Sequence, residues 1–116
     1  MNLRRLDSEG AEALRAVTPG FCHYTDALLF DEIWERPGLS KRDRSLITVA
    51  ALVALYRPDE LGTHLGLALD NGVTREELAE TLTHLAFYAA WPSANSAAYK
   101  LMEVLQARDS AAAGAL

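Results

Sequence analysis

Apolar and polar positions along the chain recur with the period of α-helices, and helix start and stop signals separate the periodic segments. An Asp7–Ser8 cap predicts a first short amphipathic helix that runs to about Val17. Thr18–Pro19 then supplies an N-cap followed by proline at the first helical position, which opens a second segment towards Trp34. Pro37–Gly38, within ERPGLS, cannot continue a helix and ends this pattern.

The next two helices have clear boundary signals as well. Ser40 predicts the start of a helix that ends near Tyr56–Arg57, and Asp43 three residues on forms part of a capping box. Pro58 falls in the first turn of the following helix. That helix is predicted to stop at Asn71–Gly72, where glycine permits a left-handed backbone.

Two further helices complete the pattern. Thr74 and Glu77 form the T-x-x-E capping box of a helix that reaches about Ala90. Pro92–Ser93 starts the last helix, which is predicted to hold through about Arg108. No hairpin signal, internal repeat or long linker interrupts the series. The sequence therefore predicts a single-domain, all-α bundle of about six helices.

The longest apolar run, Leu46 to Tyr56, changes this picture in one respect. It is about half the roughly 20 residues that a membrane span needs, so no membrane segment is predicted. As a helix it is hydrophobic on every side, which is typical of a helix buried all round. A chain of 116 residues has difficulty covering such a helix alone. We therefore expect a second subunit to lie across it.

Charge and cysteine content exclude several function classes. The formal net charge of −5 argues against nucleic acid as a partner, because nucleic-acid binding needs clustered Lys and Arg. Cys22 is the single cysteine, so neither an intramolecular disulfide nor a C-x-x-C pair can form. The amino-terminal residues contain no apolar signal segment. We expect a cytoplasmic protein.

A polar stripe on the predicted fourth helix is the first candidate for chemistry. Arg57, Glu60 and His64 lie at i, i+3 and i+7, so they share one helical face. The core residues Leu61 and Leu65 border this face and place His64 at the boundary between polar surface and core. The alternative interpretation is a half-buried structural histidine held by a hydrogen bond to Glu60.

The following helix repeats the arrangement with Glu80, His84 and Tyr88 at i, i+4 and i+8. Because a short turn joins the two helices, we expect them to pack antiparallel and to bring both stripes to one cleft. Such a cleft would suit proton transfer on a small anionic substrate. The alternative is a solvated edge at Glu80 and a tyrosine at the rim of the core at Tyr88.

Other catalytic classes are not indicated. His64 and His84 lie on different helices, and neither the Glu-x-x-His spacing of diiron bundles nor the His-x-x-x-His pair of zinc proteases is present. No metal site is therefore predicted. The chain also has no nucleophile elbow and no glycine-rich phosphate loop.

Five motifs resemble the carboxymuconolactone decarboxylase family in order and spacing. They are W-x-R-P-G-L, R-x-R-S-L, E-L-x-x-H, N-G-V-T-x-E-E and Y-x-x-W-P-x-A, and they lie between about Phe30 and Val104. The resemblance implies an all-α fold that assembles into homotrimers or homohexamers. It divides the chain into an amino-terminal helical segment (1–29), a decarboxylase-like domain (30–108) and a flexible tail (109–116).

The related alkylhydroperoxidase D-like proteins carry C-x-x-C-x-x-x-H on the equivalent helix. Counting back from His64 puts the two cysteines at Glu60 and Arg57, and an upstream glutamate at about Ser45. Thiol–disulfide exchange requires a thiolate and a resolving thiol, and both are missing here. No redox activity is therefore expected. The family often has glycine where this chain has Ala90.

The resemblance implies a decarboxylase that needs no cofactor and acts on a small carboxylated lactone or a related unsaturated or β-keto acid, as in the catabolism of aromatic compounds. A protonated His64 beside Glu60 is the expected general acid, and His84 and Tyr88 are expected to donate to the developing oxyanion. The expected substrate-binding residues are Arg57, Arg44, Trp34 and Trp91. The alternatives are an isomerase or dehydratase of a biosynthetic pathway, and a non-catalytic oligomeric module that binds small acids.

Overall fold

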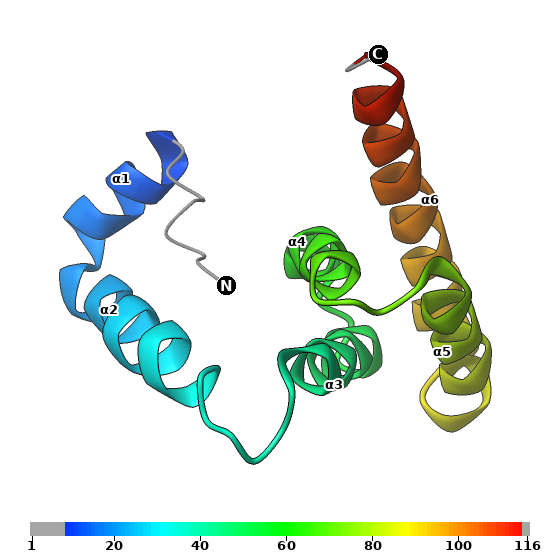
Figure 1. Cartoon of the computed structure of the whole chain (residues 1–116), viewed down its shortest axis with the longest axis horizontal. Coiled ribbons are helices and arrows are strands. Elements are labelled where there is room, and N and C mark those ends of the chain that lie inside the picture. The colour runs from blue at the N-terminus through cyan, green and yellow to red at the C-terminus, as the bar shows by residue number, and fades with distance from the viewer. Residues whose placement is uncertain (1–8, 115–116) are drawn as a thin grey trace. The chain divides into compact units, whose positions relative to one another are not determined.

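A computed structural model describes residues 9–114 of the chain, and side chains from Ala11 onwards. Asp7 and Ser8, the predicted first cap, lie outside the described residues. The described residues form helices and no strand, which confirms the predicted all-α class (Figure 1). Backbone contacts divide the chain into two units, Met1–Lys41 and Arg42–Leu116. The helices in chain order are α1 (Glu9–Val17), α2 (Pro19–Tyr24), η2 (Thr25–Ile33), α3 (Lys41–Ala54), α4 (Pro58–Asp70), α5 (Arg75–Tyr88) and α6 (Trp91–Gly114).

The amino-terminal unit contains α1, α2 and η2. Pro19 occupies the first turn of α2 as predicted. The side chain of Thr18 does not cap this helix, however, because its hydroxyl donates to the Leu14 carbonyl at 2.9 Å. The helix then widens into the π-helix η2, which the apolar pattern did not predict. The Thr25 hydroxyl donates to the Phe21 carbonyl at this transition, and such hydrogen bonds often bend helices.

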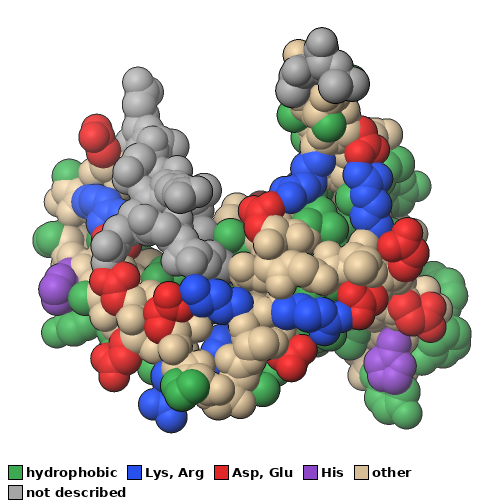
Figure 2. All heavy atoms as spheres, viewed as in Figure 1, with side chains coloured by type: hydrophobic (Ala, Val, Ile, Leu, Met, Phe, Trp, Pro, Cys, Tyr) green, Lys and Arg blue, Asp and Glu red, His purple; other side chains and the backbone are tan. Residues whose placement is uncertain are grey.

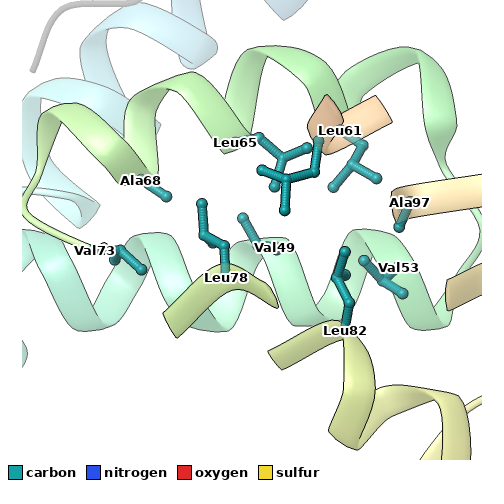
Figure 3. Packing of buried hydrophobic residues seen from close by; sticks show 10 residues of the cluster. Val49, Val53, Leu61, Leu65, Ala68, Val73, Leu78, Leu82 and Ala97 are labelled. Atoms are coloured by element: carbon teal, nitrogen blue, oxygen red, sulfur yellow. The ribbon is translucent and has the colours of Figure 1, made fainter. Parts of the chain in front are cut away.

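Four helices of the carboxy-terminal unit enclose one apolar core. In Figure 3, Leu61 and Leu65 of α4 point from their helix towards the buried side chains of α3 and α5. Leu65, Leu78 and Val49 are completely or almost completely excluded from solvent. The core consists of Val49, Val53, Leu61, Leu65, Ala68, Val73, Leu78, Leu82, Ala97 and Leu101. Each of the four helices α3, α4, α5 and α6 therefore contributes one inward stripe.

The long helix α6 is the common neighbour of α4 and α5. The backbones of both helices approach α6 closely, whereas α4 and α5 do not approach each other in this way. The predicted antiparallel packing of α4 on α5 stays a prediction, although Leu65 of α4 and Leu78 of α5 belong to the same core. Glycine makes one approach possible, because a Cβ atom at Gly62 would lie 3.3 Å from Cδ of Lys100. Further along, the guanidinium of Arg108 donates to a side-chain oxygen of Asp70.

Most local boundary signals are confirmed. Pro58 lies in the first turn of α4, and Gly72 has the left-handed φ of 100° that ends this helix. The Thr74–Glu77 capping box forms with both of its hydrogen bonds at 3.0 Å. The predicted end near Arg108 is wrong, because α6 continues to Gly114.

The long apolar run from Leu46 to Tyr56 is only partly buried. Val49 and Val53 of α3 are buried in the core, but Ile47 is 55 % exposed and Leu55, in the following turn, is 67 % exposed. One side of this segment is therefore left uncovered in the single chain. No helix among the described residues has the length and hydropathy of a membrane span.

The capping box of α5 gives a direct test of this fold. We expect Thr74→Ala to lower the free energy of unfolding by about 1 kcal/mol, because the backbone N–H of Glu77 loses its acceptor. Thr74→Ser retains the hydroxyl and is the matched control. Urea denaturation at a fixed protein concentration measures both. Equal losses in the two variants would show that the methyl group, rather than the cap, stabilises the helix.

Candidate active site

The polar stripe of α4 is positioned by the apolar stripe beside it. Leu61 and Leu65 are buried, which fixes the rotation of α4 about its axis. Glu60, one residue before Leu61, is consequently exposed, as is Arg57 at the N-cap position of the helix. His64 is half-buried at the boundary. The structure thus places His64 at the boundary between core and solvent and Glu60 in solvent, whereas Arg57 precedes the helix, so its place on the same face stays a prediction.

The environment of His64 has two opposing effects on its ionisation. Burial lowers the pKa of the imidazole below its ordinary value, because the charged form loses water. The carboxylate of Glu60, one helical turn earlier, raises the same pKa through its charge, but by less than burial lowers it. Atom Nδ1 of His64 is inaccessible to solvent. The imidazole is therefore mainly neutral near pH 7, and its protonated form is a stronger acid than an exposed histidine.

Arg57 lies at the connection between α3 and α4, beside the first turns of α6. It lines a small cavity of about 10 Å³ together with Tyr56, Ser93 and Ser96. A space of this size accommodates about one water molecule. Tyr56 has φ 54°, a left-handed conformation that is uncommon for residues other than glycine. Sequence patterns gave no reason to place Ser93 and Ser96 beside Arg57, because they follow it by more than thirty residues.

The second predicted stripe forms on α5 but is exposed. Glu80 and His84 are exposed, and Tyr88 is 80 % exposed. The rings of His84 and Tyr88 stack with centroids 4.6 Å apart and planes 15° apart. Tyr88 is therefore not a tyrosine at the rim of the core, which was the alternative interpretation. The convergence of this stripe with that of α4 on one cleft stays a prediction.

The remaining predicted substrate-binding residues lie in different surroundings. Arg44 is half-buried on α3. Trp34 is buried in the amino-terminal unit, where its ring stacks on Phe30 with centroids 6.1 Å apart. Trp91, at the start of α6, is 63 % exposed and packs edge to face against Phe87. Trp91 lines an apolar groove between α5 and α6 that includes none of the other predicted site residues.

Ser45, at the position of the glutamate in the alkylhydroperoxidase D-like proteins, has a structural role here. It is buried, and its hydroxyl accepts a hydrogen bond of 2.9 Å from the side-chain amide of Asn71. This bond ties α3 to the end of α4, the helix that carries His64. Within the described part of the chain, no group of three or more His, Cys, Asp or Glu side chains is arranged to hold a metal ion.

Comparison with known proteins identifies the family. The model of the carboxymuconolactone decarboxylase family matches residues 19–104. The chain belongs to this family. The match begins before Phe30, where the recognised motifs begin, and therefore includes α2 and all of η2.

Two curated relatives extend this result. 4-Carboxymuconolactone decarboxylase of Acinetobacter baylyi is 40 % identical over 95 residues, which cover 82 % of this chain and 71 % of the relative. Nitrosuccinic acid decarboxylase of Metarhizium robertsii is 39 % identical over 93 residues, which cover 76 % of this chain and 64 % of the relative. Both relatives are named decarboxylases. The comparisons therefore support a decarboxylase, that is, a carboxy-lyase, for this member of the family.

The depressed pKa of His64 predicts how stability varies with pH. In the unfolded chain His64 has an ordinary pKa near 6.5. As the pH is lowered, the unfolded chain therefore binds a proton at a higher pH than the folded chain does. The contribution of His64 to the free energy of unfolding is thus most favourable above about pH 6.5. It decreases as the pH falls through the pKa that His64 has in the folded chain. When the pH is lowered from 7.5 to 5, we expect the free energy of unfolding of His64→Gln to decrease less than that of the wild type.

Urea denaturation at several pH values measures this difference. His84→Gln is the control, because that imidazole is exposed in the folded chain. If His64→Gln showed the same pH dependence as the wild type, burial of His64 would not penalise its charged form.

Proposed function

We propose that this chain is a cofactor-independent decarboxylase in which His64 returns a proton to the substrate after carbon dioxide has left. The observation that carries the proposal is the position of His64, half-buried on α4 one turn after Glu60, with Arg57 at the N-cap of the same helix. This stripe combines a proton donor, a carboxylate that affects its ionisation and a guanidinium for an anionic substrate. The names of both curated relatives support the same reaction class.

The chemistry needs one proton for each molecule of carbon dioxide. When the carbon–carboxylate bond breaks, its electron pair moves into a neighbouring electron-accepting group, and a proton must then be added to the product. The imidazolium form of His64 supplies that proton and regains one from water. Burial makes this imidazolium more acidic, while a bound anion favours the charged form. Substrate binding therefore favours the protonated form of His64.

Arg57 is proposed to hold a carboxylate of the substrate. A guanidinium binds a carboxylate through two parallel hydrogen bonds, a geometry that lysine does not reproduce. Ser93 and Ser96, which line the small cavity beside Arg57, are further candidates for polar contacts to the anion. Arg44 is the second candidate for the same task, and His84 and Tyr88 remain candidates for donors to the oxyanion.

The substrate class follows from the relatives and from the reaction. One relative is named for a lactone that carries a carboxyl group, and the other for a nitro derivative of a dicarboxylic acid. A lactone carbonyl and a nitro group can both accept an electron pair. We therefore propose a small acid whose departing carboxylate lies next to such an acceptor, including carboxylated lactones and related unsaturated or β-keto acids.

The proposal also includes the oligomeric state, the cellular location and the pathway of the enzyme. We infer a homo-oligomer, a trimer or a hexamer, supported by the exposed apolar residues Ile47 and Leu55. We place it in the cytoplasm, in the catabolism of aromatic compounds. Redox activity is not proposed, because Arg57 and Glu60 stand where related peroxidases have their two cysteines.

His64→Ala tests the proposed donor. We expect carbon dioxide release to fall by ~10²–10⁴-fold, as typically follows loss of a general acid. We expect the free energy of unfolding to change by only about 1 kcal/mol, because the side chain is half-buried. Turnover on a panel of carboxylated lactones, nitro acids and β-keto acids is measured beside thermal unfolding.

Thr63→Ala, at a similarly half-buried neighbour on α4, is the control and should retain activity. Normal turnover in His64→Ala with a much lower melting temperature would identify a structural histidine instead. Binding of these acids by the wild type with no release of carbon dioxide would favour a non-catalytic binding module.

Glu60→Gln tests the electrostatic part of the proposal. The Glu60 charge raises the pKa of His64, so removing it lowers that pKa further. The protonated donor is then populated only at more acidic pH. We expect the basic limb of the kcat/KM profile to move to lower pH, with activity partly recovered in acid. A uniform loss at every pH would show that Glu60 acts in another way.

A further inference from the structure

Tyr56 has a backbone conformation that is unfavourable for a residue with a side chain. It follows α3, and its φ of 54° lies in the left-handed region. A side chain is disfavoured there because its Cβ atom comes too close to the following carbonyl oxygen. Among the described residues, Tyr56 is the one residue other than glycine with a positive φ. The turn between α3 and α4 is therefore strained at Tyr56.

The hydrogen bonds of this turn show why it needs a left-handed residue. The backbone N–H of Tyr56 donates to the Val53 carbonyl at 3.2 Å. The backbone N–H of Arg57 donates to the Leu52 carbonyl at 2.9 Å. Together these bonds form a Schellman motif, in which glycine usually occupies the left-handed position. The same turn thus fixes the backbone of Tyr56 and that of Arg57, the proposed carboxylate-binding residue.

Burial does not compensate for the strain at Tyr56. The residue is 56 % exposed and does not belong to the core of the four helices. Sparsely populated backbone conformations persist where the surrounding structure imposes them, and they cluster at active sites. Glycine at this position would form the same turn without strain. The presence of a tyrosine therefore indicates a use for its side chain.

The surroundings of Tyr56 differ from those of the aromatic residues in the groove between α5 and α6. Hydrophobic side chains gather along the outer edge of these two helices in the space-filling view (Figure 2). Trp91 lines that groove mainly among apolar neighbours. Tyr56 instead lines the small cavity that Arg57, Ser93 and Ser96 also line. A phenol that shares a cavity with an arginine and two serines can join them in binding an anion, because its O–H is a donor.

A carboxylate bound here is best one that stays on the product. A departing carboxylate loses its charge as it becomes carbon dioxide, so tight binding of that charge would stabilise the substrate more than the transition state. We propose that Tyr56 is a substrate-binding residue whose hydroxyl donates a hydrogen bond to a retained carboxylate held by Arg57. This inference rests on the proposed function and adds to it a second carboxylate on the substrate and a residue that recognises it.

Tyr56→Phe tests the hydrogen bond. Loss of a hydrogen bond to a charged group weakens binding by about tenfold or more. For acids with a second carboxylate we expect KM to rise by about that factor and kcat to stay unchanged, because the contact is the same in substrate and transition state. Tyr99→Phe is the matched control, at a tyrosine of α6 that is 61 % exposed and does not line the cavity. An unchanged KM in Tyr56→Phe, or an equal rise in Tyr99→Phe, would overturn the proposal.

A matched pair of acids identifies the carboxylate that Tyr56 contacts. Oxaloacetate and acetoacetate are both β-keto acids, and acetoacetate has a methyl group in place of the second carboxylate. Tyr56→Phe should therefore weaken the binding of oxaloacetate alone. Titration calorimetry on the wild type and the variant measures Kd for both acids. Equal losses for the two acids would place the hydroxyl on the departing carboxylate and contradict the proposal.

Tyr56→Gly separates substrate binding from folding. Glycine relieves the left-handed strain, although it also makes the unfolded chain more flexible. We expect a melting temperature at least as high as that of the wild type, together with a rise in KM as large as in Tyr56→Phe. A clearly lower melting temperature would show that the side chain stabilises the fold, which would overturn the argument from strain. A changed mass in light scattering would assign Tyr56 to a contact between subunits and would overturn the proposal as well.

Failure of the proposed function gives a different result. A wild type that binds acids with a second carboxylate but releases no carbon dioxide contradicts the decarboxylase. The Kd of Tyr56→Phe for the same acids then decides the role of Tyr56, since an increase of about tenfold supports it and an unchanged value contradicts it. A wild type that binds none of these acids contradicts both proposals.

Discussion

The burial of one stripe of α4 determines where every candidate catalytic group of this helix lies. Leu61, Leu65 and Ala68 occupy the core, and a helix with three fixed inward positions has no remaining freedom to rotate. Glu60 must then point to solvent, and His64 must lie at the boundary. The site is thus a consequence of packing: a change that let α4 rotate by one residue position would bury Glu60 or expose Leu61.

This boundary position also determines the electrostatics of His64. In full solvent its pKa would remain ordinary, and in the dry core a charged imidazole would be prohibitively unstable. At half burial the charged form is destabilised, but the Glu60 charge, one turn away, offsets part of the penalty. A histidine with these properties is mainly neutral near pH 7 and, once protonated, gives up its proton more readily than an exposed histidine. Such a group suits a reaction that consumes a proton only after a bond has broken.

Most features that depend on short stretches of sequence could be predicted, although the missing Thr18 cap and the π-helix η2 show that not all could. Features that depend on distant contacts could not be predicted. The capping box at Thr74, the proline at Pro58 and the glycine at Gly72 act within one turn of the chain, so their positions were confirmed. The stripe of α4 followed from helical periodicity alone. The close approach of α6 to both α4 and α5 depends on long-range packing, which periodicity does not encode. The same limit concealed Ser93 and Ser96 beside Arg57.

The size of the chain connects the core, the candidate site and the open apolar groove. Four helices share a core to which each contributes a single inward stripe, so their other faces remain available for other uses. On α4 the face beside the core is polar and carries His64, whereas on α5 and α6 an apolar face remains open. None of the groove residues belongs to the stripe of Arg57, Glu60 and His64. Substitutions at the stripe therefore need not disturb either the core or the groove. One scaffold can in this way serve decarboxylases with chemically different substrates, as the lactone and nitro acid in the names of the two relatives illustrate.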